Sequence, residues 1–332
     1  MSSVSSSQII KTIFFRLLSS LLTLFLLITF IFFLVRLSPG NPTDKYISAK
    51  LGNELSEKIA DKFSLNQPIT DQYFSFLLNS FSGEFGISYN FHLPVFEVIR
   101  EYFLFTLGFA IISFLIQIFL GMKLAVWITR KNNEWLGKFT SNFSLFIYSI
   151  PAFVLGVTLI YFFSVQLELF PISGLKSINY DDMSLLTKII DQIQHLILPI
   201  ITLSLPGVAL FYKYIKESIE DIEIQIFVTN LRSAGLDEKI ILKKHILPNA
   251  IKPLISIAGI ELGILLGGTL ITEVIFSLPG MGRLAIDSIL SRDYPLIIGC
   301  VFTAGSVMII ANFLADLVKL KIDKRLIKGI LN

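Results

Sequence analysis

Few residues of this 332-residue chain have both a reactive or ionisable side chain and a sequence context in which it could take part in chemistry. Glu261 lies near the middle of an apolar run over residues 254–276. A carboxyl group inside such a run is costly to place in a membrane and indicates a functional site by default. Two interpretations stay open: a polar group on a path through the membrane or at a subunit interface, or a hydrogen-bonded group between helices with no such role. Glu273, near the end of the same run, is a second candidate, as a gate, a loop anchor or a substrate contact.

The other reactive side chains are too scattered for catalysis or for a metal site. His92, His195 and His245 stand far apart, and Cys300 is the single cysteine. Zinc sites need clustered His and Cys ligands, and a disulfide needs a second cysteine. The sequence contains no Gly-x-x-x-x-Gly-Lys-Ser/Thr phosphate-binding loop and no Gly-x-Ser-x-Gly nucleophile elbow. We therefore expect a chain that is not an enzyme and that has no catalytic residue, no metal site and no cofactor of its own.

Composition points to a membrane protein. Hydrophobic residues make up 53% of the chain and charged residues 16%, and the mean hydropathy is +0.72. Six apolar runs are long enough to cross a bilayer as helices; they cover about residues 13–35, 103–128, 143–165, 196–215, 254–276 and 296–318. A cleaved signal peptide is the alternative for the first run. That run is too long for a signal core and no small-x-small cleavage pattern follows it, so we expect a retained anchor.

A polar segment over residues 36–102 predicts a small helical cap between the first two spans. Helical apolar spacing occurs at residues 55–63 and 69–78, and Asn66-Gln-Pro68 marks a break between them. The cap is too short to build a large core of its own. We therefore expect one all-α, polytopic membrane domain over residues 1–332.

Lysine and arginine residues set the expected orientation. They are denser in the N-terminal segment, in the connections between spans 2 and 3 and between spans 4 and 5, and in the C-terminal segment. In the other segments acidic residues match or outnumber them. Both termini and residues 216–252 are therefore expected in the cytoplasm, and the cap outside. The net charge of +3, without a basic stripe, gives no reason to expect nucleic acid as a partner.

The stretch 227–248 is polar and charged, yet its pattern is that of two short helices broken at Gly235. Asp237 and Glu238 suit the start of the second helix, where the helix dipole favours negative charge. The basic run that ends at His245 suits its end, and Pro248 is expected to stop it.

The second of these short helices has an apolar side formed by Ile240, Ile241 and Ile246. An apolar helix side held next to a membrane usually has a partner that buries it. A solvated loop that only links two spans is the alternative from the residues alone.

This stretch resembles the cytoplasmic EAA loop of inner-membrane permease subunits of binding-protein-dependent ABC importers, in the dipeptide, oligopeptide and nickel group. Val228, Arg232, Gly235 and Leu236 match that group's version of the motif, and Leu247-Pro248 stands at its spacing. Further resemblances follow in the family's order along the chain: Leu37-Ser-Pro-Gly-Asn-Pro42, Asn66-Gln-Pro68, Gly83-Glu-Phe-Gly86, His195 to Pro199, Glu273 to Arg283 and Arg292 to Pro295. Each is weak alone, but their joint order and spacing are specific.

The chain departs from the family pattern at several positions. Leu231 and Ser233 replace small residues beside Arg232, so the fit to a partner is expected to differ there. Glu261 stands where the family often has an amide, and Lys324 replaces a common proline.

The resemblance implies the type I ABC importer permease fold with six transmembrane helices. It also implies a cell-inner-membrane subunit that forms half of a pathway for dipeptides or oligopeptides. The implied partners are a second related permease, two ATP-binding subunits that hold the ATP, and an extracytoplasmic substrate-binding protein. An importer permease for nickel or another small solute is the alternative. An ion-coupled secondary transporter is a weaker one, because it predicts inverted repeats and several charges inside the spans.

Two groups of residues receive a role through the resemblance. Coupling to the ATPase is assigned to Phe227, Val228, Arg232, Ala234, Gly235, Leu236, Asp237, Glu238, Ile241, His245, Leu247 and Pro248. The outer loop is assigned to Pro279, Gly280, Gly282 and Arg283.

Overall fold

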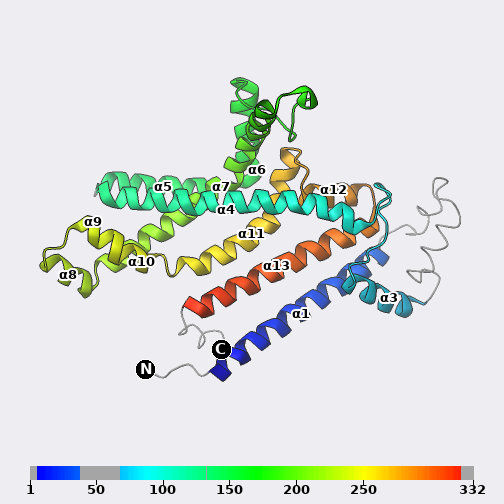
Figure 1. Ribbon diagram of the computed structural model, residues 1–332, viewed down its shortest axis with the longest axis horizontal. Helices are drawn as coiled ribbons and strands as arrows, with labels where there is room; N and C mark the ends of the chain where they lie inside the picture. The colour runs from blue at the N-terminus through cyan, green and yellow to red at the C-terminus, as the bar shows by residue number, and fades with distance from the viewer. Residues whose placement is uncertain (1–5, 38–67, 132, 323–332) are drawn as a thin grey trace. The chain divides into compact units, whose positions relative to one another are not determined.

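The structure is a computed structural model that describes residues 6–37, 68–131 and 133–322 (Figure 1). These residues fold into helices, with one isolated bridge between Ile87 and Pro94. The helix expected at residues 55–63 lies outside the described residues. The chain forms two compact units: the first has Leu107–Leu278 as its main part, and the second consists of Phe15–Thr106 and Pro279–Ile310.

Helix α7 (Leu185–Glu223) is the centre of the first unit. It packs against α5 (Glu134–Ser149), α6 (Ala152–Leu159) and α11 (Leu254–Ile275). It also approaches α4 (Val95–Lys131) so closely that only glycine fits at residue 121. A Cβ atom at Gly121 would lie 2.7 Å from Cβ of Phe211 and 3.0 Å from the backbone nitrogen of Tyr212. Small residues permit this kind of backbone contact between membrane helices.

Two prolines lie inside α7, and a side chain from α4 supports the helix near the second. Pro199 and Pro206 cannot donate to the helical ladder, yet α7 runs unbroken through both. The Nε2 atom of Gln117 donates a hydrogen bond of 3.1 Å to the backbone carbonyl of Leu203. Gly207 leaves room for this amide, because a Cβ atom there would overlap it. The amide of Gln117 therefore links α4 to α7.

The predicted third span, residues 143–165, is not one straight helix. Helix α5 ends at Ser149, Ile150 is extended with ψ 124°, and α6 starts after Pro151 and continues as a π-helical turn, η1 (Ile160–Gln166). The two parts meet at 98°. Proline disfavours helical geometry at the residue before it, which explains the bend. Among the described residues, five helices are long and apolar enough to cross a membrane, and the bent pair makes a sixth span if it counts as one.

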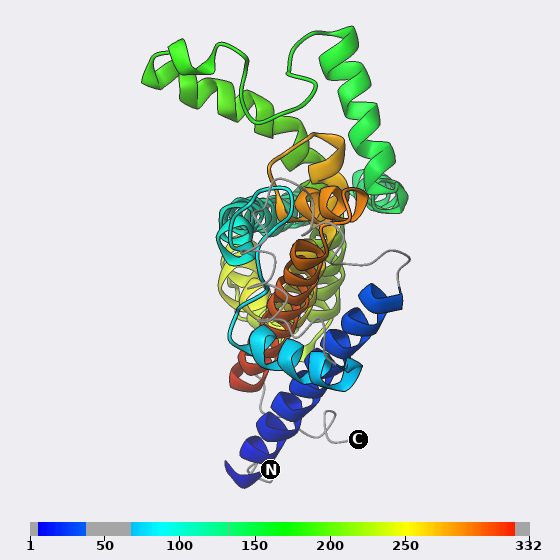
Figure 2. The ribbon, with the colours of Figure 1, turned by 90° about the vertical axis from the view of Figure 1, so that its right-hand side faces the viewer.

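The connection from η1 to α7 is anchored within its own unit. It contains a short 3-10 turn, η2 (Tyr180–Asp182). The backbone N–H of Gly174 donates to the carbonyl of Phe276 at 2.8 Å, and the hydroxyl of Ser164 donates to the carbonyl of Pro171 at 3.1 Å. Figure 2 shows this connection as a loop that joins two separate green helices.

The second unit contains most of α1 (Ser6–Leu37), α3 (Ile69–Phe81), α12 (Met281–Leu290) and parts of α4 and α13 (Tyr294–Ile322). Its core includes Val95, Val98, Ile99, Leu284, Leu296 and Cys300. Helix α3 belongs to the described part of the predicted cap, residues 68–102. Its Tyr73 hydroxyl lies 2.7 Å from the Thr29 hydroxyl of α1, and its ring centroid lies 5.2 Å from that of Phe32.

Candidate coupling site

The stretch with the EAA pattern forms a helical hairpin, residues 226–250, at one end of α7 (Figure 1). Its parts are α8 (Ile226–Ser233), α9 (Glu238–Ile240), a π-helical turn η3 (Ile241–Ile246) and α10 (Leu247–Ala250). The predicted cytoplasmic loop over residues 216–252 includes the last turns of α7, which stays helical to Glu223. An ion pair of 2.8 Å between Lys216 and Glu220, one turn apart, supports this extension.

The break between the two helices is a Schellman turn at Gly235. The Gly235 N–H donates to the carbonyl of Arg232 at 2.9 Å, and the Leu236 N–H donates to the carbonyl of Leu231 at 3.2 Å. These bonds satisfy the last carbonyls of α8. The turn needs the positive φ of 79° that Gly235 adopts, while a Cβ atom there would meet nothing within 4 Å. The requirement for glycine is therefore one of backbone conformation and not of space.

An ion pair closes the turn from outside. The Arg232 guanidinium donates from Nε to Oε1 of Glu238 at 2.7 Å and from Nη2 to Oε2 at 3.2 Å. Hydrogen bonding to Glu238 raises the pKa of Arg232 further above its usual value. The Asp237 carboxylate caps α9 by accepting from the Lys239 N–H at 2.7 Å. The two bonds between Arg232 and Glu238 fix the direction as well as the distance between α8 and α9.

The inner side of the hairpin is locked onto α7. Val228, Ile241 and Ile246 are each at most 1% exposed, and they belong to one core cluster with Ile215 and Ile219 of α7. The expectation that a partner buries this apolar side is therefore wrong for Ile241 and Ile246. The π-helical turn explains the difference, because its i to i+5 bonding brings residues five apart toward one face. Of Ile240, Ile241 and Ile246, only Ile240 is exposed, with 44% of its surface accessible.

The expected stop at Pro248 is also wrong. The helical path continues to Ala250, because Pro248 lies at the start of α10, where its missing N–H leaves no bond unmade. The Ser218 hydroxyl of α7 donates to the Ala250 carbonyl at 3.0 Å and ties this end of the hairpin down.

The assigned coupling residues therefore divide by exposure. Phe227, Arg232, Ala234, Gly235, Asp237, Glu238 and Pro248 are exposed, Leu236, His245 and Leu247 are half-buried, and Val228 and Ile241 are buried. The hairpin thus presents an outer surface of both charged and apolar residues on an apolar base fixed to α7. A force on the outer surface would reach α7 through packed side chains.

The two glutamates of α11 have different surroundings. Glu261 is partly buried, whereas Glu273 is fully buried and its backbone carbonyl accepts from the Leu278 N–H at 2.8 Å. In this conformation Glu273 offers no surface to a pathway or to a partner.

The predicted outer-loop residues start α12. Gly280 is the N-cap of that helix, the Met281 N–H donates to the Thr106 hydroxyl at 2.8 Å, and Arg283 Nε lies 3.6 Å from Asp287 Oδ2. Pro279 directly precedes the cap, and Gly282 lies in the first turn. The loop is thus an ordered helix entry.

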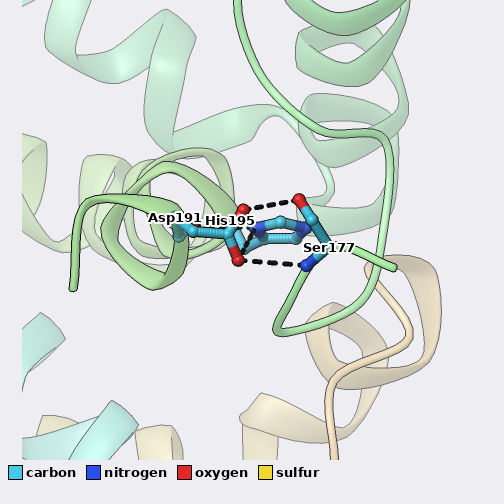
Figure 3. Close-up of polar contacts among 3 residues, drawn as sticks. All are labelled: Ser177, Asp191 and His195. Carbon is cyan, nitrogen blue, oxygen red and sulfur yellow. Dashed lines mark hydrogen bonds and ion pairs between the residues drawn. The ribbon is translucent and has the colours of Figure 1, made fainter. Parts of the chain in front are cut away.

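A buried polar cluster that the sequence did not predict joins Ser177, Asp191 and His195 (Figure 3). The Ser177 hydroxyl donates to Asp191 Oδ1 at 2.5 Å, and its backbone N–H donates to Oδ2 at 3.0 Å. His195 Nδ1 lies 2.8 Å from the backbone carbonyl of Asp191, to which it donates. The hydroxyl proton is engaged by the carboxylate and not by the imidazole, so the group is not arranged as a serine nucleophile with its base. The i, i+4 spacing of Asp191 and His195 was the available signal; nothing in the sequence pointed to Ser177.

A second unpredicted centre is Asp293 in the other unit. Its carboxylate accepts from the Ser88 hydroxyl at 2.5 Å, from the Asn90 N–H at 3.1 Å and from the Leu296 N–H at 3.3 Å. Its position three residues before Leu296 at the start of an apolar run is the signal of a helix cap. Among the described residues, no group of three or more His, Cys, Asp or Glu side chains could hold a metal ion.

Two family models match the chain. Residues 117–328 match the inner membrane component of binding-protein-dependent transport systems, and residues 9–110 match the N-terminal part of the membrane component of such systems. A probable peptide ABC transporter permease of Sinorhizobium fredii is 29% identical over 311 residues, which cover 94% of this chain and 97% of that protein. A nickel import system permease of Staphylococcus aureus is 32% identical over 320 residues, which cover 96% and 92%.

Solved structures show a similar fold. A methionine ABC transporter in inward-facing conformations matches with a TM-score of 0.51 and 18% identity, over 70% of this chain and 96% of the matched chain. An amino acid ABC transporter matches with the same TM-score and identity, over 68% and 94%.

Proposed function

The chain belongs to the family of inner membrane components of binding-protein-dependent transport systems, and from this premise we propose that its hairpin couples a partner ATPase to movement of α7. The chain is a permease subunit of an ABC importer and a multi-pass inner-membrane protein. It is a transport subunit and not an enzyme, since ATP hydrolysis in such importers belongs to partner subunits. The predicted type I importer permease fold is confirmed by the likeness to the two solved transporters.

The observation that carries the proposal is the fixed attachment of the hairpin to α7. The exposed ion pair between Arg232 and Glu238 lies on the surface offered to a partner, and Ile241 and Ile246 connect that surface to the core around α7. A partner that moves the hairpin must therefore move α7 or break this packing. Since α7 has 39 residues and packs against α5, α6 and α11, its tilt would open or close a pathway.

Replacement of Gly235 by valine tests this coupling in the assembled, reconstituted importer. A β-branched residue at φ 79° costs at least about 1–2 kcal/mol and disturbs the turn without filling any occupied space. We expect assembly to persist and substrate-stimulated ATP hydrolysis to fall at least about ten-fold.

Gly83→Val is the matched control, because Gly83 has φ 75° and equally open surroundings but lies outside the hairpin. Full stimulation in an assembled Gly235→Val complex, or equal losses in both variants, would argue against a specific coupling role.

We also propose that the pathway forms between this chain and a second, related permease, with an extracytoplasmic binding protein that delivers the substrate. Two ATP-binding subunits would hold the ATP, and the hairpin and both termini would face the cytoplasm. The density of lysine and arginine in and around the hairpin supports this orientation.

Peptides are the substrate class we propose first, in line with the peptide permease of S. fredii. Nickel, free or chelated, is the second candidate, and the nickel permease of S. aureus supports it at slightly higher identity. The cognate binding protein, purified without denaturation, distinguishes them. Mass spectrometry of the released ligand should find peptides, and metal analysis should find less than stoichiometric nickel. One nickel ion per binding protein, with no peptide, would reverse this order.

A further inference from the structure

A charged groove of about 720 Å³ lies between the hairpin and the ends of three helices in the first unit. Arg130 of α4, Lys138 of α5 and Lys216 of α7 line one part of it. Arg232 and Lys239 of the hairpin line another. Four glutamates, Glu134, Glu220, Glu223 and Glu238, line the groove as well, so its five basic residues leave it a small net positive charge.

Three of these five cations already have acidic partners. Lys138 pairs with Glu134 at 3.4 Å, Lys216 with Glu220 at 2.8 Å and Arg232 with Glu238 at 2.7 Å. Arg130 and Lys239 have no ion-pair partner among the described residues, and they stand on different elements, α4 and α9. Two unpaired cations on separate walls suit an anion held between them.

The groove lies at the level where the spans end. Trp127 and Trp135, the only tryptophans of the chain, flank its lining on α4 and α5 and are 48% and 71% exposed. Tryptophan is enriched at membrane interfaces because its ring is apolar and its N–H needs a polar partner. Phe139 stacks on Trp135 with 5.5 Å between ring centroids and extends the exposed aromatic surface along α5. An occupant of the groove would thus have its charge at the headgroup level and an apolar surface beside it.

We propose that this groove binds the phosphodiester headgroup of an anionic phospholipid, between Arg130 and Lys239. The phosphodiester would form ion pairs with both cations, and the acyl chains of the lipid would lie along the aromatic side of α5. Basic pockets between helices near the membrane surface bind anionic headgroups in this way. Because Lys239 belongs to the hairpin, the lipid would link the hairpin to α4. This inference rests on insertion in the bilayer and not on the ATPase coupling proposed above.

The two tryptophans allow a direct test on the full chain reconstituted in vesicles. Phosphatidylglycerol or phosphatidylcholine with brominated acyl chains is added at a low mole fraction to unlabelled phosphatidylcholine, and tryptophan quenching is compared. We expect the anionic lipid to quench several-fold more strongly. Arg130→Gln and Lys239→Gln should each weaken its apparent affinity by about five-fold, the factor expected for one surface cation. Lys123→Gln is the matched control, since Lys123 is an exposed cation of α4 that does not line the groove.

The outcomes decide the proposal separately from the coupling function. Equal quenching by the two lipids overturns it, and so does a selectivity that both groove variants retain or that Lys123→Gln reduces as much. Loss of the selectivity on addition of millimolar inorganic phosphate would assign the groove to a small free anion instead. Circular dichroism checks that each variant keeps its helix content, and either single variant suffices for the comparison.

Discussion

Among single residues, Asp191 gives the sharpest prediction, because one buried carboxylate holds a whole loop. It accepts two hydrogen bonds from Ser177, and the loop around Ser177 carries an exposed trypsin site at Lys176. Asp191→Asn replaces a charged acceptor by a neutral amide and weakens both bonds. We expect cleavage after Lys176 to accelerate at least about five-fold, the factor that roughly 1 kcal/mol of lost hydrogen bonding gives.

Asp181→Asn is the control for this comparison. Asp181 is an exposed acid of the same loop, so its replacement should leave the rate of cleavage unchanged. If both variants were cleaved at the wild-type rate, the carboxylate of Asp191 would not hold the loop.

Single residues also show which contacts the sequence could not predict. An amide in an apolar run has few partners other than a neighbouring helix, and Gln117 does hydrogen-bond to Leu203 of α7. The partner of Asp191 lies outside its helix, 14 positions away, and Ser88 is 205 positions away from Asp293. No local pattern encodes such a separation.

Among elements, the helical hairpin was predictable wherever local chemistry decides. Gly235 indicated the break and Asp237 the second helix start, because a positive φ and a cap each depend on a few neighbouring residues. The continuation through Pro248 and the burial of Ile246 were not predictable, since both follow from a π-helical turn packed on α7. An α-helical period assigns the wrong face to residues on a π-helical turn.

The bend in the third span was also only partly predictable from local sequence. Apolar content predicted a crossing segment at residues 143–165, but content says nothing about direction. Pro151 was visible in the sequence as a kink signal, while the 98° bend also depends on the packing of α5 and α6 against α7. Proline marks the position of a bend, and tertiary packing sets its size.

At the scale of the whole molecule, the hairpin and the 167–184 loop before α7 carry opposite net charges. The hairpin carries Arg232, Lys239, Lys243 and Lys244, whereas the loop before α7 holds Asp181 and Asp182 beside Lys176. Positively charged segments stay in the cytoplasm during insertion. The hairpin is therefore expected inside the cell and the 167–184 loop outside.

Single cysteines in a Cys300→Ser background check this orientation in intact cells. Cys300 is 2% exposed, so its removal takes away only a buried thiol. Asn230 of α8 and Ile178 of the loop are both exposed, and a cysteine at either position would be accessible to reagent. A membrane-impermeant maleimide should label Ile178→Cys at once and Asn230→Cys only after permeabilisation. The reverse pattern would place the hairpin on the extracytoplasmic side, where there is no ATP. Both the orientation and the coupling proposal would then fail.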